Sequence, residues 1–382
     1  MSARAREAAA NALLVVGSLA TLFLLLEVAV RLFLPVADIP WHEGDPVVGY
    51  RLAPNQSGTW FGEGIHATYR INGSGFNNEH EYTVERTPGH ARVAVLGDSY
   101  VEALYIDRGR RFFDVLEAGL RGAGEPADVF TYAVSGYGTG QELLLLQNEV
   151  VRDRPDLVIL LWVSNDLSDT ACAVSRGAEG PCFYFDDAGH LAHRPPRPHA
   201  PNRKVRLVLN SALARYVAIN LNAVGLWRAI WTDGGPRGEP WTMTYARTPP
   251  PDWVEAWRVF DGCILEMARF CRDEGIPFLL VHQPIVSRHF RALLADVPGG
   301  GDVSLPARRF ADLASRHGFR FFDLTPAFLV EGRIDPKRWI NVGVGHWNPA
   351  AHEAAGTALV APVLDLLGGA AQGVGAGEPG AE

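Results

Sequence analysis

The sequence predicts an α/β protein: a three-layer α/β/α sandwich around a mainly parallel five-stranded sheet, preceded by an N-terminal transmembrane helix. Three observations predict this fold. Five short apolar segments after residue 91 are each bounded by turn residues, as expected of strands that are covered on both faces. Segments with helical spacing alternate with them, which is typical of parallel sheets. A long, almost uncharged apolar run precedes both.

Residues 1–36 are predicted to form a membrane anchor. Arg4 and Arg6 precede the apolar run Ala8–Leu26, and a bilayer-spanning helix needs about 20 mostly apolar residues. The short basic leader favours a cytoplasmic N-terminus, with the main domain in the periplasm or outside the cell. A cleaved signal peptide is the alternative, although the apolar run is longer than a usual signal core.

Residues 37–90 are predicted to form a small β-rich extension. They are rich in Gly, Asn, Tyr and Trp and contain alternating pieces such as "ATYRING". At the other end of the chain, residues 368–382 are rich in Gly and Ala, and we expect them to be disordered.

The main domain is expected to span residues 91–367, with an insertion at about 168–252 that is too long for a simple crossover. In such domains ligands bind beyond the carboxyl ends of the strands. Strands are expected at Val93–Leu96, Val129–Val134, Leu157–Val163, Phe278–His282 and Phe321–Leu324, and helices near Arg111–Leu120, Gln141–Val151, Trp253–Glu274, Leu305–His317 and Ala350–Leu367.

The four cysteines suggest one possible disulfide. Cys172 and Cys182 lie in one loop of the insertion and are candidates to pair, which an oxidising compartment would preserve. Cys263 and Cys271 lie in a helical segment and are expected to be buried free thiols. Their spacing resembles no zinc pattern, so no metal site is predicted.

Four residues at predicted strand ends carry chemistry. Ser99 follows the first strand in "GDS", where it is either a nucleophile or a helix cap. Gly136 follows the second strand in "VSGYGTGQE", and glycines there let backbone N–H groups approach an oxyanion. Asn165 follows the third strand, and its amide can donate to an oxyanion or form an Asx turn. His346 precedes the last helix and is the candidate base.

Together these blocks resemble the SGNH/GDSL hydrolase superfamily, which carries Ser, Gly, Asn and His in this order. The resemblance covers roughly residues 92–367 and extends to membrane-attached bacterial members. It implies that Ser99 attacks an acyl carbonyl while His346 takes its proton. It also implies an oxyanion hole formed by the N–H groups of Ser99 and Gly136 and the side chain of Asn165.

The sequence departs from that pattern at several positions. Val163 stands where the third block usually has glycine, and Ala103 stands where glycine often follows the serine. Gly343 and Val344 occupy the usual positions of the aspartate that orients the histidine. Three explanations stay open: a Ser–His dyad, an acid from elsewhere such as Asp335, or a protein that has lost hydrolysis and only binds.

The sequence therefore predicts a serine esterase or deacylase that acts on a small-molecule or glycan ester. A cell-envelope glycan is a possible substrate class. An O-acyltransferase that acetylates a polysaccharide and a non-catalytic glycan-binding protein are the alternatives. The net charge of −8 argues against nucleic-acid binding, and no organic or metal cofactor is predicted.

Overall fold

The computed structural model describes residues 3–62, 65–175, 180–197, 210–221, 240–286, 294–295, 297–341 and 345–374. Its centre is a five-stranded sheet with the order β11-β10-β7-β5-β6. The strands are β5 (Ala91–Gly97), β6 (Ala127–Ala133), β7 (Leu157–Trp162), β10 (Phe278–His282) and β11 (Arg320–Asp323). Each pair of neighbours is parallel. The predicted fold class is confirmed.

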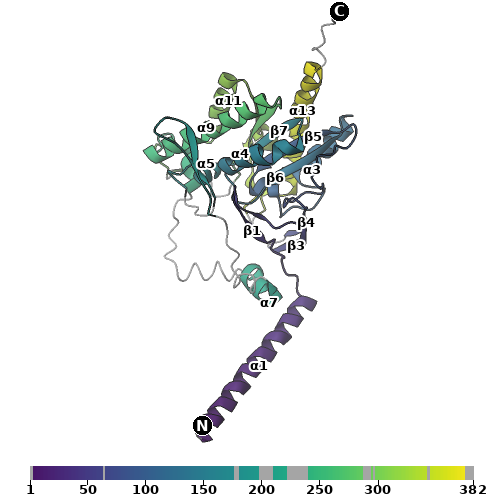
Figure 1. Cartoon of the computed structure of the whole chain (residues 1–382), viewed down its shortest axis with the longest axis vertical. Helices are drawn as coiled ribbons and strands as arrows, with labels where there is room; N and C mark the ends of the chain where they lie inside the picture. The colour runs from purple at the N-terminus through teal and green to yellow at the C-terminus, as the bar shows by residue number, and fades with distance from the viewer. Residues whose placement is uncertain are drawn as a thin grey trace, which may run out of the picture.

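Helices cover both faces of this sheet (Figure 1). One face packs on α4 (Thr139–Asn148), α9 (Pro251–Asp273) and α11 (Leu305–His317). The other packs on α3 (Phe112–Gly122) and α13 (Pro349–Val374). Successive strand residues point to opposite faces, so Val95 joins the second core and Leu96 the first. Burial on both faces explains why the strands are almost continuously apolar.

The short elements fill the connections between these strands and helices. They are α2 (Ser99–Glu102), the 3₁₀ helix η1 (Val150–Asp153), α5 (Asp166–Thr170), the 3₁₀ helices η3 (Pro240–Tyr245) and η4 (Thr325–Phe328), the strands β12 (Leu329–Val330) and β13 (Arg333–Ile334), and α12 (Pro336–Trp339). The expected helix at Gln141–Val151 is thus an α-helix followed by a 3₁₀ turn.

The C-terminal boundary differs from the prediction. Helix α13 continues to Val374, into the segment that was expected to be disordered from residue 368. Ala370, Ala371 and Gln372 favour helix, which explains why the helix does not end at the glycines of 368 and 369. The helix therefore overlaps the expected disordered segment over residues 368–374, and residues 375–382 lie outside the described part of the chain.

The N-terminal extension consists of two small antiparallel sheets. Strands β1 (His42–Asp45) and β2 (Gly49–Leu52) form one, and β3 (Gln56–Gly62) and β4 (Ile65–Ile71) form the other. The extension is fastened to the main domain through buried amides: Asn77 Nδ2 donates to Glu102 O at 2.7 Å, and Asn78 Nδ2 donates to Val129 O at 2.9 Å.

The insertion contributes a hairpin of β8 (Cys182–Phe185) and β9 (Leu191–Arg194). A disulfide joins Cys172 and Cys182, whose Cα atoms lie 4.9 Å apart. Cys263 and Cys271 are free and buried in α9, as expected. Further along the insertion, α7 (Ala212–Arg215) continues into the π-helix η2 (Tyr216–Asn220).

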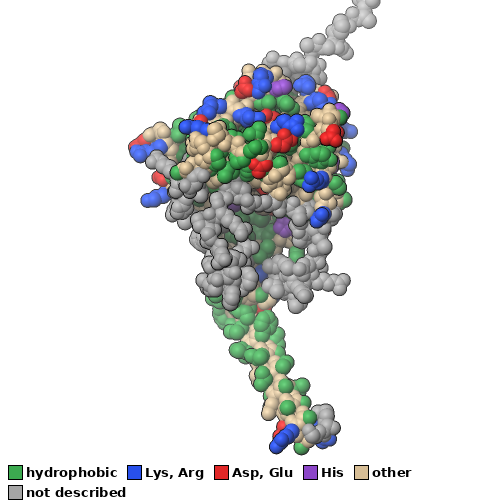
Figure 2. All heavy atoms as spheres, turned by 90° about the vertical axis from the view of Figure 1, so that its left-hand side faces the viewer, with side chains coloured by type: hydrophobic (Ala, Val, Ile, Leu, Met, Phe, Trp, Pro, Cys, Tyr) green, Lys and Arg blue, Asp and Glu red, His purple; other side chains and the backbone are tan. Residues whose placement is uncertain are grey.

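Helix α1 (Ala3–Phe33) projects from the domain and is covered with exposed apolar side chains (Figures 1 and 2). It has 31 residues, is long and apolar enough to cross a membrane, and has almost none of its apolar stretch buried. Glu27 pairs with Arg31 and accepts hydrogen bonds from the backbone N–H groups of Ala212 and Leu213, each at 2.9 Å. A membrane anchor and a signal sequence are both compatible with such a helix.

Candidate active site

Ser99 lies on the tight turn between β5 and α2. Gly97 makes this turn possible, because a Cβ there would lie 2.3 Å from Val101 Cγ2. Asp98 is the N-cap of α2, and its Oδ1 accepts a hydrogen bond from the N–H of Tyr100 at 3.0 Å. Asp98 therefore does the capping. The hydroxyl of Ser99 lies 3.3 Å from Asp98 Oδ2 and has a second, closer partner.

That partner is His346, whose Nε2 lies 2.8 Å from Ser99 Oγ. The two residues are 247 positions apart in the sequence. Trp347, which follows the histidine, is buried in the core beside α13. The N–H of Asn341 donates to the carbonyl of His346 at 2.9 Å, and Asn348 Oδ1 accepts from the backbone at the start of α13. These contacts hold His346 and the residues that follow it.

Two tyrosine rings pack against the imidazole. The ring centroid of Tyr100 lies 4.7 Å from that of His346, and the centroid of Tyr105 lies 5.3 Å from it. Tyr105 in turn makes an edge-to-face contact of 4.8 Å with Trp60, a residue of β3. Aromatic contacts at these distances restrict the orientation of the imidazole.

Two backbone donors are available beside this pair. Gly136 is exposed and has φ +83°, a left-handed conformation that glycine adopts without strain. Neither its N–H nor that of Ser99 has an acceptor within the described part of the chain. Unpaired N–H groups at the ends of adjacent parallel strands are what an oxyanion hole requires.

Asn165 is held differently from the expectation. Its Nδ2 donates to Asp98 Oδ2 at 3.2 Å and to Asp169 Oδ2 at 2.9 Å. An amide nitrogen has two hydrogens, so both are engaged by carboxylates in this structure. Donation from Asn165 to an oxyanion would need one of these bonds to be exchanged.

Five acidic side chains form a cluster around Asp98, directly before the serine. Asp98, Glu102, Glu142 and Asp166 are buried, and Asp169 is partly buried. Burial raises the pKa of Asp98 and of Asp169 to about 6 and that of Glu102 to about 7. Burial, together with repulsion between neighbouring carboxylates, raises the pKa of Glu142 and of Asp166 well above the usual range. Several of these groups therefore keep a proton near neutral pH.

The candidate acid Asp335 is occupied elsewhere. It caps α12, and its Oδ1 accepts a hydrogen bond from the N–H of Lys337 at 3.0 Å. Asp323, the next acid upstream, accepts from His282 Nδ1 at 2.9 Å and from the N–H of Thr325 at 2.9 Å.

The remaining departures from the motif have separate outcomes. Gly343 and Val344 lie outside the described residues. Ala103 has φ +50° at the C-terminus of α2, a left-handed conformation that glycine adopts more readily. His352, the other histidine of this region, is buried and accepts from the N–H of Phe112 at 3.0 Å. Burial lowers its pKa to about 3, so it stays neutral and structural.

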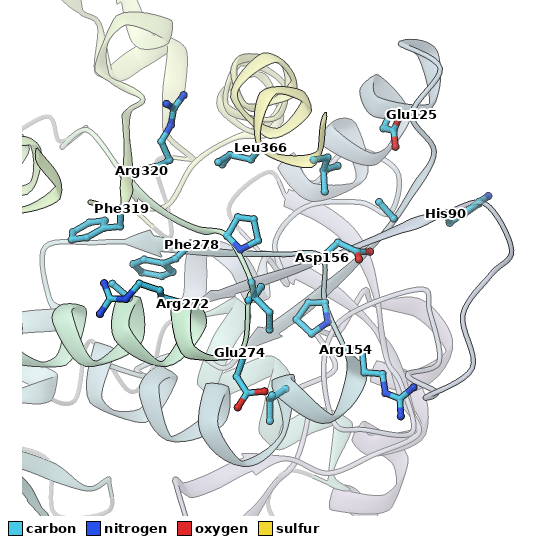
Figure 3. Close-up of a pocket in the computed structure, with 18 of the residues that line it drawn as sticks. His90, Glu125, Arg154, Asp156, Arg272, Glu274, Phe278, Phe319, Arg320 and Leu366 are labelled. Carbon is cyan, nitrogen blue, oxygen red and sulfur yellow. The ribbon is translucent and has the colours of Figure 1, made fainter. Parts of the chain in front are cut away.

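A large groove lies at the amino ends of the strands, on the other side of the sheet from the carboxyl ends that carry Ser99 and Gly136 (Figure 3). Its volume is about 1230 Å³, and its lining includes Ala91, Phe278 and Arg320, the first residues of three strands. Ser99 and Gly136 follow strands instead of starting them. The groove is therefore separate from the Ser99–His346 pair. Among the described residues, no group of three His, Cys, Asp or Glu side chains is arranged to hold a metal ion.

Sequence reasoning missed the contribution of the N-terminal extension to this site. Trp60 reaches the site through Tyr105, and the hydroxyl of Tyr50 donates to Ser135 O at 3.0 Å, directly before Gly136. The stretch containing both is rich in aromatic residues. An aromatic-rich stretch between the apolar helix and the main domain was the available signal, but it does not specify which residues face the site.

Comparison with solved structures finds similar folds. The chain aligns with TesA at 15% identity and a TM-score of 0.39, covering 72% of this chain and 99% of that one. It aligns with a GDSL-like lipase from Bacteroides thetaiotaomicron VPI-5482 at 14% identity and a TM-score of 0.38, covering 73% and 90%. In fold, the chain is similar to GDSL-type lipases and acylhydrolases.

A third similar structure is a carbohydrate acetylesterase family member from Sinorhizobium meliloti. The identity is 16% and the TM-score 0.36, over 73% of this chain and 99% of that one. No protein-family model matches the sequence, and no curated protein matches it. At these identities and TM-scores, the roles of the site residues rest on their geometry and not on the similarity.

Proposed function

We propose that this protein is a serine esterase or deacylase that hydrolyses ester bonds, as the SGNH/GDSL hydrolases do. The observation that carries the proposal is the 2.8 Å contact between Ser99 Oγ and His346 Nε2. A serine hydroxyl that is hydrogen-bonded to an imidazole is an activated nucleophile. The N–H groups of Ser99 and Gly136, which have no acceptor among the described residues, would bind the negative charge of the intermediate.

In the proposed reaction, Ser99 Oγ attacks the ester carbonyl while its proton passes to His346 Nε2. The tetrahedral oxyanion is bound by the N–H groups of Ser99 and Gly136. As the C–O bond to the alcohol breaks, His346 returns the proton to the leaving alcohol. Water then attacks the acyl carbonyl while His346 takes its proton. As the bond from the acyl carbon to Ser99 Oγ breaks, His346 returns the proton to Ser99 Oγ and the acid leaves.

Helix α1 supports a location for this activity at a membrane. Its apolar surface is exposed along its length, and its first residues include Arg4 and Arg6. With α1 as a retained anchor, the cytoplasmic N-terminus follows from the basic leader, and the disulfide fits an oxidising periplasm or exterior. An acetylated cell-envelope glycan is then the substrate class within reach of the site.

The test uses the full chain in detergent with a chromogenic acetyl ester and a fluorophosphonate probe. We expect turnover and labelling, both abolished in Ser99→Ala. The control is Ser304→Ala, which removes an exposed hydroxyl at the start of α11 and should leave both signals unchanged.

The result that overturns the proposal is wild-type protein without turnover or labelling, which would favour a binding protein on a hydrolase fold. Adding an oligosaccharide to the reaction distinguishes hydrolysis from acyl transfer. Acetylated sugar formed at the expense of free acetate would identify an acyltransferase with the same nucleophile.

A further inference from the structure

Tyr50 connects the N-terminal extension to the loop that follows β6. Its hydroxyl donates a hydrogen bond to Ser135 O at 3.0 Å. Its ring packs edge-on against Tyr137 with centroids 5.3 Å apart, and the hydroxyl of Tyr137 donates to the carbonyl of Tyr50. These contacts with Tyr137 hold the ring of Tyr50 against the loop, with its hydroxyl on the carbonyl of Ser135.

That carbonyl belongs to the same peptide unit as the N–H of Gly136. A trans peptide is planar, and its C=O and N–H point in opposite directions. A bond that holds the Ser135 carbonyl therefore also sets the direction of the Gly136 N–H. The hydroxyl of Tyr50 also lies close to Gly136 itself, since a Cβ added to that glycine would lie 2.9 Å from the hydroxyl oxygen.

The Ser135–Gly136 peptide needs such a restraint, because glycine at φ +83° is free to rotate. Ser135 itself is tied through its side chain: its hydroxyl donates to the carboxyl group of Glu102, on the helix that begins with Ser99. That bond holds the Cα and side chain of Ser135. Among the described residues, the hydrogen bond from Tyr50 is the one that holds its carbonyl.

We infer that Tyr50 is a positioning residue for the oxyanion hole: its hydrogen bond to Ser135 O directs the Gly136 N–H at the developing oxyanion. The inference rests on the proposed function and deepens it, because it makes the N-terminal extension a working part of the catalytic site. An acyl substrate then meets a hole that the main domain does not complete alone.

The test compares Tyr50→Phe with Tyr82→Phe in the full chain. Tyr82 is a matched control: it also lies in the extension, is half-buried, and donates to a backbone carbonyl of β6, Thr131 O, at 2.7 Å. Both variants keep the ring and lose the hydroxyl. Tyr82 also accepts from the N–H of Thr131 at 2.8 Å, so its variant should lose at least as much stability.

For Tyr50→Phe we expect kcat to fall about tenfold with KM within about twofold of wild type, less than the roughly 10²–10³-fold loss of a whole oxyanion donor. Affinity for a boronic acid that forms a tetrahedral adduct with Ser99 should fall by the same factor as kcat/KM. Tyr82→Phe should change neither quantity. A merely structural role for Tyr50 would not separate kcat from KM or weaken the adduct selectively.

Wild-type kinetics and boronate affinity in Tyr50→Phe would overturn the inference while leaving the proposed esterase intact. Equal losses in both variants would also overturn it, by assigning the effect to stability. Wild-type protein that neither turns over esters nor labels with fluorophosphonate would overturn the proposed function and this inference together.

Discussion

The imidazole of His346 is held in place by two tyrosine rings and by its own loop. Tyr100 and Tyr105 pack against it, and the loop is fixed by the burial of Trp347 and by the backbone bond from Asn341. In a Ser–His–Asp triad the acid keeps the imidazole in one orientation. Here the packing of Tyr100 and Tyr105 restricts that orientation, as a Ser–His dyad requires.

The dyad predicts that Asp335→Asn leaves kcat within about twofold of wild type. The carboxylate of Asp335 caps α12, and asparagine caps a helix about as well as aspartate. The measurement is steady-state hydrolysis of the acetyl ester. His346→Gln provides the scale, since loss of the base should lower kcat by roughly 10³-fold or more. A loss of comparable size in Asp335→Asn would contradict the dyad.

The β8–β9 hairpin is attached to the helices beside the site. Phe183 in β8 packs so closely on α4 that a Cβ on Gly140 would lie 2.3 Å from its ring. The bridge from Ala171 to Phe183 joins the hairpin to the end of α5, which follows Asn165. The disulfide between Cys172 and Cys182 closes this connection over a separation of ten residues.

We therefore predict that the double variant Cys172→Ser/Cys182→Ser loses about 2–3 kcal/mol of unfolding free energy, the usual effect for a closed loop of this length. Denaturant unfolding measures it. Reductant supplies the matched control: it should lower the midpoint of wild type to that of the variant and leave the variant unchanged. A wild-type midpoint that is insensitive to reductant would contradict the prediction.

For the whole molecule, the sequence predicted the sheet and the meeting of Ser99 with His346. Both follow from local patterns: apolar strands identify the layers, and parallel strands bring their carboxyl ends to one edge. The contribution of Tyr50 and the two carboxylate acceptors of Asn165 were not predictable in this way. They depend on how the extension and α5 pack on the sheet, and no spacing in the sequence encodes that contact.

The five carboxyl groups of the cluster around Asp98 affect the stability of the whole fold. Two of them, Glu142 and Asp166, have pKa values well above the usual range because they are buried and repel one another as anions. Among the described residues, both oxygens of Glu142 and one oxygen of Asp166 are buried without a recorded side-chain hydrogen bond. Their ionisation is therefore unfavourable in the folded state, whereas in the unfolded chain they ionise at ordinary pKa values.

This imbalance fixes the sign of the pH dependence. Between pH 6.5 and 8.5 the unfolded chain has already released these protons, whereas the folded state still holds some of them. Raising the pH through the folded-state pKa values then costs stability, and each pKa unit corresponds to about 1.4 kcal/mol. We expect the thermal midpoint to be higher at pH 6.5 than at pH 8.5, by roughly 2–4 °C for each kcal/mol. His80, whose pKa is raised by its bond to Glu117, contributes in the same direction, whereas His352, whose pKa is lowered by burial, contributes a smaller effect of opposite sign near pH 6.5.

Glu142→Gln isolates the carboxyl cluster from that background. Glutamine stays neutral at every pH and removes the repulsion on Asp166, so the difference between the two midpoints should shrink, and the variant should equal or exceed wild type at pH 8.5. Glu125→Gln is the control, because Glu125 is exposed on the main domain; its pH dependence should match that of wild type. Calorimetry at the two pH values decides the matter. A Glu142→Gln variant with an undiminished pH dependence would show that the ionisation of Glu142 and Asp166 does not cause the loss of stability at high pH.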